Sequence, residues 1–170
     1  RMVSFGSNHE EVHGFKLLSS INPDDYDGVL SPSGMTALYD AAVNGIEATS
    51  NYGRKLLEND YDVNGIVFVI TDGQDNQSAT TVDTVKKALE AAVRGENLQS
   101  LVSVLIAVNC ENGGKQILED FHVAAGFTQF VALPDATKNT LAKLAAFVSK
   151  SISSSSVALT QKTSPPSLTF

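Results

Sequence analysis

Two segments carry oxygen-bearing side chains at positions where a metal ion could bind. Thr36 stands where a glycine-containing loop runs into a helical pattern, and Asp72 closely follows the apolar run 66–70. A hydroxyl and a carboxylate are hard oxygen ligands, which suit Mg²⁺ or Ca²⁺ better than zinc. Ligands of open α/β sheets collect outside the carboxyl ends of the strands. Asp72 is therefore well placed for a site, and Thr36 can reach it if its helix begins at the same edge.

Asp75 and Asn76 follow Asp72 in the same polar loop. They could support a metal-bound water or contact a partner, and they are explained equally well as solvated polar residues of a turn. A strand that ends in Asp-Gly also marks ordinary turns, so this loop alone does not define a site.

A second motif, His9-Glu10-Glu11-Val12-His13, matches the H-E-x-x-H pattern of zinc hydrolases. In those enzymes two histidines on one face of a helix bind zinc, and the glutamate acts as general base. Here the motif lies in a short span between two strand-like pieces, with no room for a helix of several turns. We expect a solvated hairpin loop, and a zinc hydrolase that uses His9, Glu10 and His13 is a remote alternative.

The elements that must position these residues follow from the apolar pattern. Short runs rich in β-branched residues, without polar alternation, are typical of strands covered on both faces of a parallel sheet. Between them, apolar residues recur at helical spacing. The expected strands are 66–70, 101–108 and 130–133, and the expected helices are about 36–51, 82–94, 117–125 and 141–152. This alternation predicts an α/β fold with a Rossmann-like, open, mostly parallel sheet flanked by helices on both sides.

The two ends of the chain differ from this pattern. Residues 2–5 and 15–18 predict two short strands joined as a hairpin by a polar loop. From Ser153 onward the chain is rich in serine and proline, which predicts a flexible tail or linker. We therefore expect one domain over residues 1–152 and a tail over 153–170.

Composition narrows the classes of partner. Among 170 residues there are 12 Lys+Arg and 19 Asp+Glu, a formal net charge of -7. This balance argues against binding to nucleic acid or to an anionic membrane surface, since both attract positive faces. No apolar run reaches the roughly 20 residues of a membrane-spanning helix, so membrane insertion is not expected. A single cysteine excludes an internal disulfide framework and a cysteine-based zinc cluster.

The two oxygen-bearing segments resemble motifs of the von Willebrand factor type A (VWA) domain. Gly34-x-Thr36-x-Leu38-Tyr39-Asp40-Ala41 is similar to the family's threonine motif, and Ile70-Thr71-Asp72-Gly73 is similar to its aspartate motif. Residues 117–127 and 135–148 resemble the passages around the family's last strand, and residues 2–5 and 15–19 resemble its second and third strands. The resemblance covers about residues 2–152.

This resemblance implies a metal-ion-dependent adhesion site (MIDAS) at the top of the sheet. Thr36 and Asp72 would bind Mg²⁺, or Ca²⁺ or Mn²⁺, directly or through water, and Asp40 would be structural. An acidic residue of a protein partner would complete the coordination shell. The implied function is a non-enzymatic, protein-binding module.

One motif of the family is not found here. Its Asp-x-Ser-x-Ser sequence, on the first strand, would lie upstream of Met2, and Ser4-Phe5-Gly6-Ser7 lacks the aspartate. We therefore expect an N-terminally incomplete VWA-like domain, with weak metal binding or none by this chain alone. Without that central strand, the opening hairpin should be separated from strand 66–70. The alternative function is a metal-free VWA scaffold subunit in a larger assembly.

Overall fold

The computed structural model describes residues 1–30, 34–95, 98–110, 113–166 and 170. Helices follow strands along most of the chain, as the apolar pattern predicts. In chain order the elements are β1 (Met2–Phe5), β2 (His9–His13), the 3₁₀ helices η1 (Leu18–Ser20) and η2 (Pro23–Tyr26), α1 (Leu38–Leu57), β3 (Asn64–Thr71), α2 (Val82–Arg94), β4 (Ser100–Val108), α3 (Gly114–Ala125), β5 (Gln129–Leu133) and α4 (Lys138–Gln161).

The main sheet is parallel and has the order β3-β4-β5. The ladder between β3 and β4 runs from Asn64 opposite Ser100 to Thr71 opposite Ala107, and β5 pairs with the second half of β4. All three predicted strands are confirmed as parallel neighbours. Their side chains are apolar on both faces because helices cover both faces, which is the physical reason for the unalternated runs.

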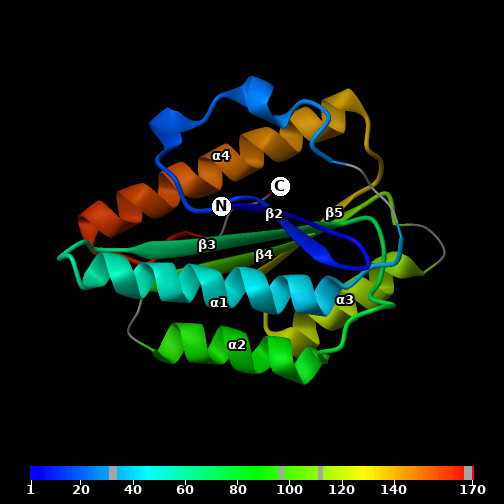
Figure 1. Ribbon diagram of the computed structural model, residues 1–170, viewed down its shortest axis with the longest axis horizontal. Helices are drawn as coiled ribbons and strands as arrows, with labels where there is room; N and C mark the ends of the chain where they lie inside the picture. The colour runs from blue at the N-terminus through cyan, green and yellow to red at the C-terminus, as the bar shows by residue number, and fades with distance from the viewer. Residues whose placement is uncertain (31–33, 96–97, 111–112, 167–169) are drawn as a thin grey trace.

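Helices cover the two faces of this sheet unequally (Figure 1). On one face α1, α2 and α3 enclose a core that includes Leu38, Ile46, Val85 and Leu105. On the other face α4 packs Leu144 and Phe147 against residues of β4 and β5. The chain is therefore an α/β protein with a three-stranded parallel sheet between helices, an arrangement compatible with a Rossmann-like fold.

The opening hairpin forms, but with a different second strand from the one predicted. β1 pairs antiparallel with β2, so Phe5 lies opposite His9 and Met2 opposite His13. The expectation of a strand at residues 15–18 is wrong: Phe15 stacks on Tyr52 of α1, with ring centroids 4.2 Å apart. The second strand consists of the residues that the tight turn after β1 brings back beside β1. Pairing with β1, and not the hydrophobicity of the segment, therefore determines which residues form it.

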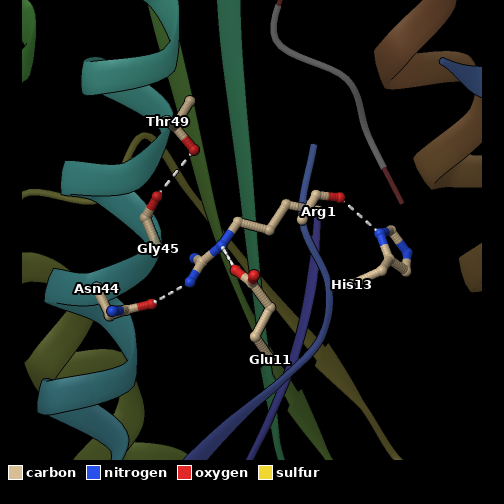
Figure 2. A network of polar contacts seen from close by, with 7 residues as sticks. Arg1, Glu11, His13, Asn44, Gly45 and Thr49 are labelled. Carbon is tan, nitrogen blue, oxygen red and sulfur yellow. Dashed lines mark hydrogen bonds and ion pairs between the residues drawn. The ribbon is translucent and has the colours of Figure 1, made fainter. Parts of the chain in front are cut away.

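The hairpin is a sheet of its own, separate from β3-β4-β5, as expected. Phe5 of β1 packs against the core under α1, and polar contacts add to this link. Arg1 forms an ion pair with Glu11 of β2 and donates from Nη2 to Oδ1 of Asn44 on α1, at 2.8 Å (Figure 2). One arginine thus bridges the hairpin to α1.

The last helix continues through the serine run, so the expectation of a flexible tail from Ser153 is wrong for residues 153–161. The Ser153 hydroxyl donates to the Ser149 carbonyl one turn earlier, at 2.9 Å. Ser155 is only 4% exposed, and its carbonyl and hydroxyl oxygens accept from Nδ2 of Asn64, at 3.0 and 3.3 Å. Packing at the start of β3 therefore keeps this segment helical. Neither α4 nor any other helix in the described residues is long and apolar enough to cross a membrane.

Candidate functional site

Thr36 and Asp72 lie at the same edge of the molecule, beyond the carboxyl end of β3. Asp72 directly follows the last residue of β3, and Thr36 lies two residues before the start of α1. Thr36 Oγ1 is 3.8 Å from the position that a Cβ would occupy on Gly73, the neighbour of Asp72. The Asp72 side chain is exposed, and Thr36 is half-buried. The structure thus brings the Thr36 hydroxyl against the turn that carries Asp72.

Two hydrogen bonds, one to a side chain and one between backbones, hold the Thr36 segment against the loop after β3. The Thr36 amide donates to Oδ1 of Asn76 at 2.7 Å, and the Asn76 amide donates to the Thr36 carbonyl at 3.0 Å. The amide oxygen of Asn76 is therefore engaged in positioning Thr36. Its role in the fold is to fasten one segment of the candidate site to the other.

Asp75 and Ser78 cap the first turn of α1 from a distant part of the chain. The Ser78 hydroxyl donates to Oδ1 of Asp75 and accepts from the amides of Tyr39 and Asp40, at 3.0 and 3.1 Å. The Tyr39 amide also reaches Oδ1 of Asp75, at 3.3 Å. Amides in the first turn of a helix have no partner within the helix, and a negative charge there is favourable. Asp75 therefore stabilises the start of α1.

Asp40 completes the connection between helix and loop. Its carboxylate accepts from the amides of Ala79 and Thr80, both at 2.9 Å, and from the Thr80 hydroxyl at 2.6 Å. Burial by itself would raise the pKa of Asp40, but these hydrogen bonds outweigh it and hold the pKa below its usual range. The expected structural role of Asp40 is confirmed.

Thr71 fixes the turn from which Asp72 projects. Its hydroxyl donates to the Gly73 carbonyl at 2.8 Å and accepts from the Gly73 amide at 3.2 Å. Thr71 is buried, while Asp72 between the two bonded residues is exposed. The end of β3 is therefore a hydrogen-bonded turn that presents one carboxylate to solvent.

The turn between β1 and β2 forms another wall of this edge. The Met35 amide donates to Oγ of Ser7 at 2.9 Å, and the Ala37 amide donates to the Gly6 carbonyl at 2.8 Å. Gly34 has a φ of 80°, and a Cβ there would lie 2.4 Å from Ser7 Oγ. Sequence reasoning missed the positioning roles of Ser7 and Ser78, because only the folded chain brings them to the start of α1.

Cys110, just beyond the end of β4, lies close enough to Asp72 for the charge to affect its thiol. Burial, and then the negative charge of Asp72, raise the pKa of Cys110. The thiol also donates to the Val108 carbonyl, with 3.6 Å between sulfur and oxygen. A thiol with a raised pKa is protonated at neutral pH, so Cys110 is a poor nucleophile.

The H-E-x-x-H residues form strand β2, so the expected loop is wrong for residues 9–13. On a strand, residues four apart are separated by about 13 Å, whereas zinc binds each histidine nitrogen at about 2 Å. His13 also has contacts at both ring nitrogens: Gly14 O lies 2.7 Å from Nδ1, and the Tyr26 hydroxyl lies 2.8 Å from Nε2. His9 and His13 therefore do not form the zinc-binding face of a hydrolase.

The divalent cation that the motifs imply would be held by Thr36 and Asp72. Within the described residues, no group of three or more His, Cys, Asp or Glu side chains could hold a metal ion. Thr36 and Asp72 provide one hydroxyl and one carboxylate. That set fits Mg²⁺, which keeps several of its waters and is often bound through one or two carboxylates.

The chain was compared with known proteins at the level of families, sequences and structures. No protein-family model, no curated protein and no solved structure matches it. Membership of the VWA family stays a prediction that depends on the two motifs and on the edge of the sheet at which they meet.

Proposed function

We propose that this chain is a VWA-like, non-enzymatic module that binds a protein partner through a divalent cation. Thr36 and Asp72 hold Mg²⁺, or Ca²⁺ or Mn²⁺, and an acidic residue of the partner completes its coordination shell. The observation that carries this proposal is an exposed carboxylate, that of Asp72, on the turn against which the Thr36 hydroxyl lies, at the carboxyl edge of the sheet.

The surroundings of Asp72 support binding rather than covalent catalysis. Nucleophilic catalysis needs a hydroxyl or thiol that is hydrogen-bonded to a base. In the described part of this edge, the Cys110 thiol bonds to a backbone carbonyl and its pKa is raised. Two further carboxylates near this edge are engaged as well: Asp75 is bonded to the start of α1, and Asp40 is bonded to residues 79–80.

Two protein ligands leave most of the metal shell to water, so the metal should bind weakly to the chain alone. A carboxylate supplied from outside would replace water and add a charged ligand. Metal and carboxylate should therefore strengthen each other's binding by the same factor, as thermodynamic linkage requires.

The test is a titration of the purified chain with Mn²⁺, observed by paramagnetic broadening of backbone amide resonances, without and with glutamate as the carboxylate. We expect broadening centred on residues 72–73 and 36, with a lower apparent Kd when glutamate is present. Asp72→Asn and Thr36→Val should both lose this effect. Asp25→Asn, a change at an exposed aspartate of η2, is the matched control. Equal broadening in wild type and in both site variants would overturn the proposal.

The alternative is a metal-free VWA scaffold within a larger assembly. It is favoured by the engagement of Asp75 and Asn76 in contacts that hold the loop to α1. If wild type shows no Mn²⁺-dependent broadening at residues 36 and 72, with or without glutamate, this alternative replaces the metal-bridged module.

A further inference from the structure

A cavity of about 230 Å³ lies between α2, the first residues of β4 and the turn that leads from α3 into β5. Helices α2 and α3 are on the same face of the main sheet (Figure 1). β5 begins at Gln129, opposite Val104, so residues 100–103 of β4 extend beyond it. The cavity therefore lies beside the start of β4, where α3 has ended and β5 has not yet begun.

The size of this cavity suits a small organic molecule. An apolar cavity of roughly 150 Å³ holds benzene, and sites for drug-sized ligands start at about 300 Å³. At about 230 Å³, the cavity has room for a ligand of about eight to ten heavy atoms.

Part of the lining is an apolar floor, formed by Leu89 of α2, Leu101 of β4 and Ala125 of α3. Leu89 and Ala125 belong to the core on this face of the sheet, and Leu101 packs against that core. Three different elements therefore hold the floor in place. Transfer of an aliphatic group from water onto such a surface is favourable.

Two hydroxyl groups, those of Ser103 and Thr128, line the same cavity and form a hydroxyl pair. The Ser103 amide donates to Oγ1 of Thr128 at 3.1 Å, and the Thr128 amide donates to Oγ of Ser103 at 3.0 Å. The two hydroxyl oxygens are 3.3 Å apart, so one hydroxyl donates to the other. The hydrogen of the second hydroxyl has no acceptor in the part of the chain that the structure describes. Ser103 is only 1% exposed, so the pair offers one free donor beside a buried side chain.

One side of α2 brings charged residues to the rim of the cavity. Lys86, Glu90 and Arg94 are spaced four apart and all line it. Nη2 of Arg94 lies 3.3 Å from Oε2 of Glu90, so these two charges compensate each other. Lys86 forms no ion pair within the described residues. The rim therefore carries one uncompensated positive charge, on a chain whose formal net charge is -7.

These features select the chemical class of the ligand. A phosphate monoester carries about two negative charges at neutral pH, whereas a single cation of the rim is unpaired among the described residues. A neutral apolar molecule would leave both the ammonium group of Lys86 and the free hydroxyl without an acceptor. A carboxylate has one negative charge and two acceptor oxygens, which match one ammonium and one hydroxyl donor.

We infer that this cavity is a binding site for a small aliphatic carboxylate of about five to seven carbons. Its carboxylate accepts hydrogen bonds from the Lys86 ammonium and from the free hydroxyl of the hydroxyl pair, and its chain packs on the apolar floor. The cavity lies at the amino end of β4, whereas Thr36 and Asp72 lie at the carboxyl end of the sheet. The site needs no metal and does not depend on the proposed function.

The test is an NMR titration of the full chain with hexanoate, in buffer free of divalent cations so that no carboxylate binds through a metal. We expect backbone amide shifts that saturate with a Kd of about 1 mM, as for a ligand of about eight heavy atoms with modest efficiency. The shifts should centre on residues 101–103 and 125–128. Hexanol has the same chain without the charge and should bind roughly fivefold more weakly. Acetate has the charge without the chain and should give no saturable shifts.

Lys86→Gln removes the uncompensated charge and should raise the Kd for hexanoate roughly fivefold. The matched control is Lys87→Gln, at the next position of α2, where the lysine is outside the cavity lining and is paired with Asp83 at 2.7 Å. This change should leave the Kd as it is in wild type. Both lysines are exposed, so neither variant should lose the fold.

Three results would contradict the inference. One is the absence of saturable shifts with hexanoate, or shifts that centre on another apolar surface, such as the exposed Leu17 and Leu18. Another is equal affinity for hexanol and hexanoate, which would show that the cavity recognises an aliphatic chain and not a carboxylate. The third is an equal Kd in Lys86→Gln and Lys87→Gln, which would show that Lys86 does not bind the carboxylate.

Discussion

Asp40 shows, at the scale of single residues, how a short loop is fixed to a helix. Its pKa is held low because the hydrogen bonds from Ala79 and Thr80 outweigh its partial burial. A carboxylate whose folded pKa is depressed stabilises the fold at pH values above its unfolded pKa, about 3.9. This stabilisation is lost as the pH falls through the lower, folded pKa. We expect Asp40→Asn to reduce the free energy of unfolding by roughly 1 kcal/mol at pH 7.

The check is urea denaturation of wild type and Asp40→Asn from pH 7 downward. The difference in free energy of unfolding between the two proteins should shrink once the pH falls below about 4. A protonated Asp40 is no longer a stronger hydrogen-bond acceptor than the asparagine amide. Asp25→Asn, in which the exposed carboxylate of η2 is removed, serves as the comparison. A difference for Asp40→Asn that stays constant over this pH range would show that the charge of Asp40 is not what stabilises the loop.

The same residues show why a site can be located from sequence before it can be described. Thr36 and Asp72 could be placed at one edge because parallel strands end on the same side of a sheet. The engagement of Asp75 and Asn76 could not be predicted. Their partners, at the start of α1, are about 40 positions away in the chain and become neighbours only in the folded state.

At the scale of elements, the strands and helices that can be predicted are those with a clear apolar pattern in the sequence. Strands 66–70, 101–108 and 130–133 were identified because burial on both faces demands unbroken apolar runs. β2 and the end of α4 were missed because their residues are polar. Pairing with β1 determines β2, and contact with Asn64 determines the serine turns of α4. In both elements tertiary contacts outweigh local propensity.

Asn64 at the start of β3 supports the last turns of α4. Asn64→Ala removes the side-chain amide that donates to both the carbonyl and the hydroxyl oxygen of Ser155. Ser155 is buried, and both oxygens lose this partner. Loss of a partner for a buried polar group costs about 1–3 kcal/mol. We expect faster amide exchange over residues 153–161 in Asn64→Ala.

Ser153→Ala provides the matched control for this helix. Its hydroxyl is exposed and bonds only within α4, and alanine has the higher helix propensity, so stability should stay the same or rise slightly. Exchange in residues 153–161 that is unchanged by Asn64→Ala would mean that the serine turns are helical without support from β3.

At the scale of the whole molecule, the described residues form two sheets that share no backbone ladder. A two-stranded hairpin is marginally stable by itself, and here it is tied to α1 by the Arg1 bridge and by two hydrogen bonds from residues 35 and 37 to its turn. The hairpin should therefore open as a separate unit, at a lower free energy than the β3-β4-β5 core. In native-state hydrogen exchange we expect amides of β1 and β2 to exchange at denaturant concentrations that leave β3 to β5 protected.

Asn44→Ala tests the same division, since it removes the α1 end of the Arg1 bridge without touching either sheet. It should speed exchange in β1 and β2 and leave the slowest amides of β4 unchanged. If the hairpin and the core exchange at one common free energy in wild type and in Asn44→Ala, the chain already folds as a single unit and the polar bridge is not its weak point.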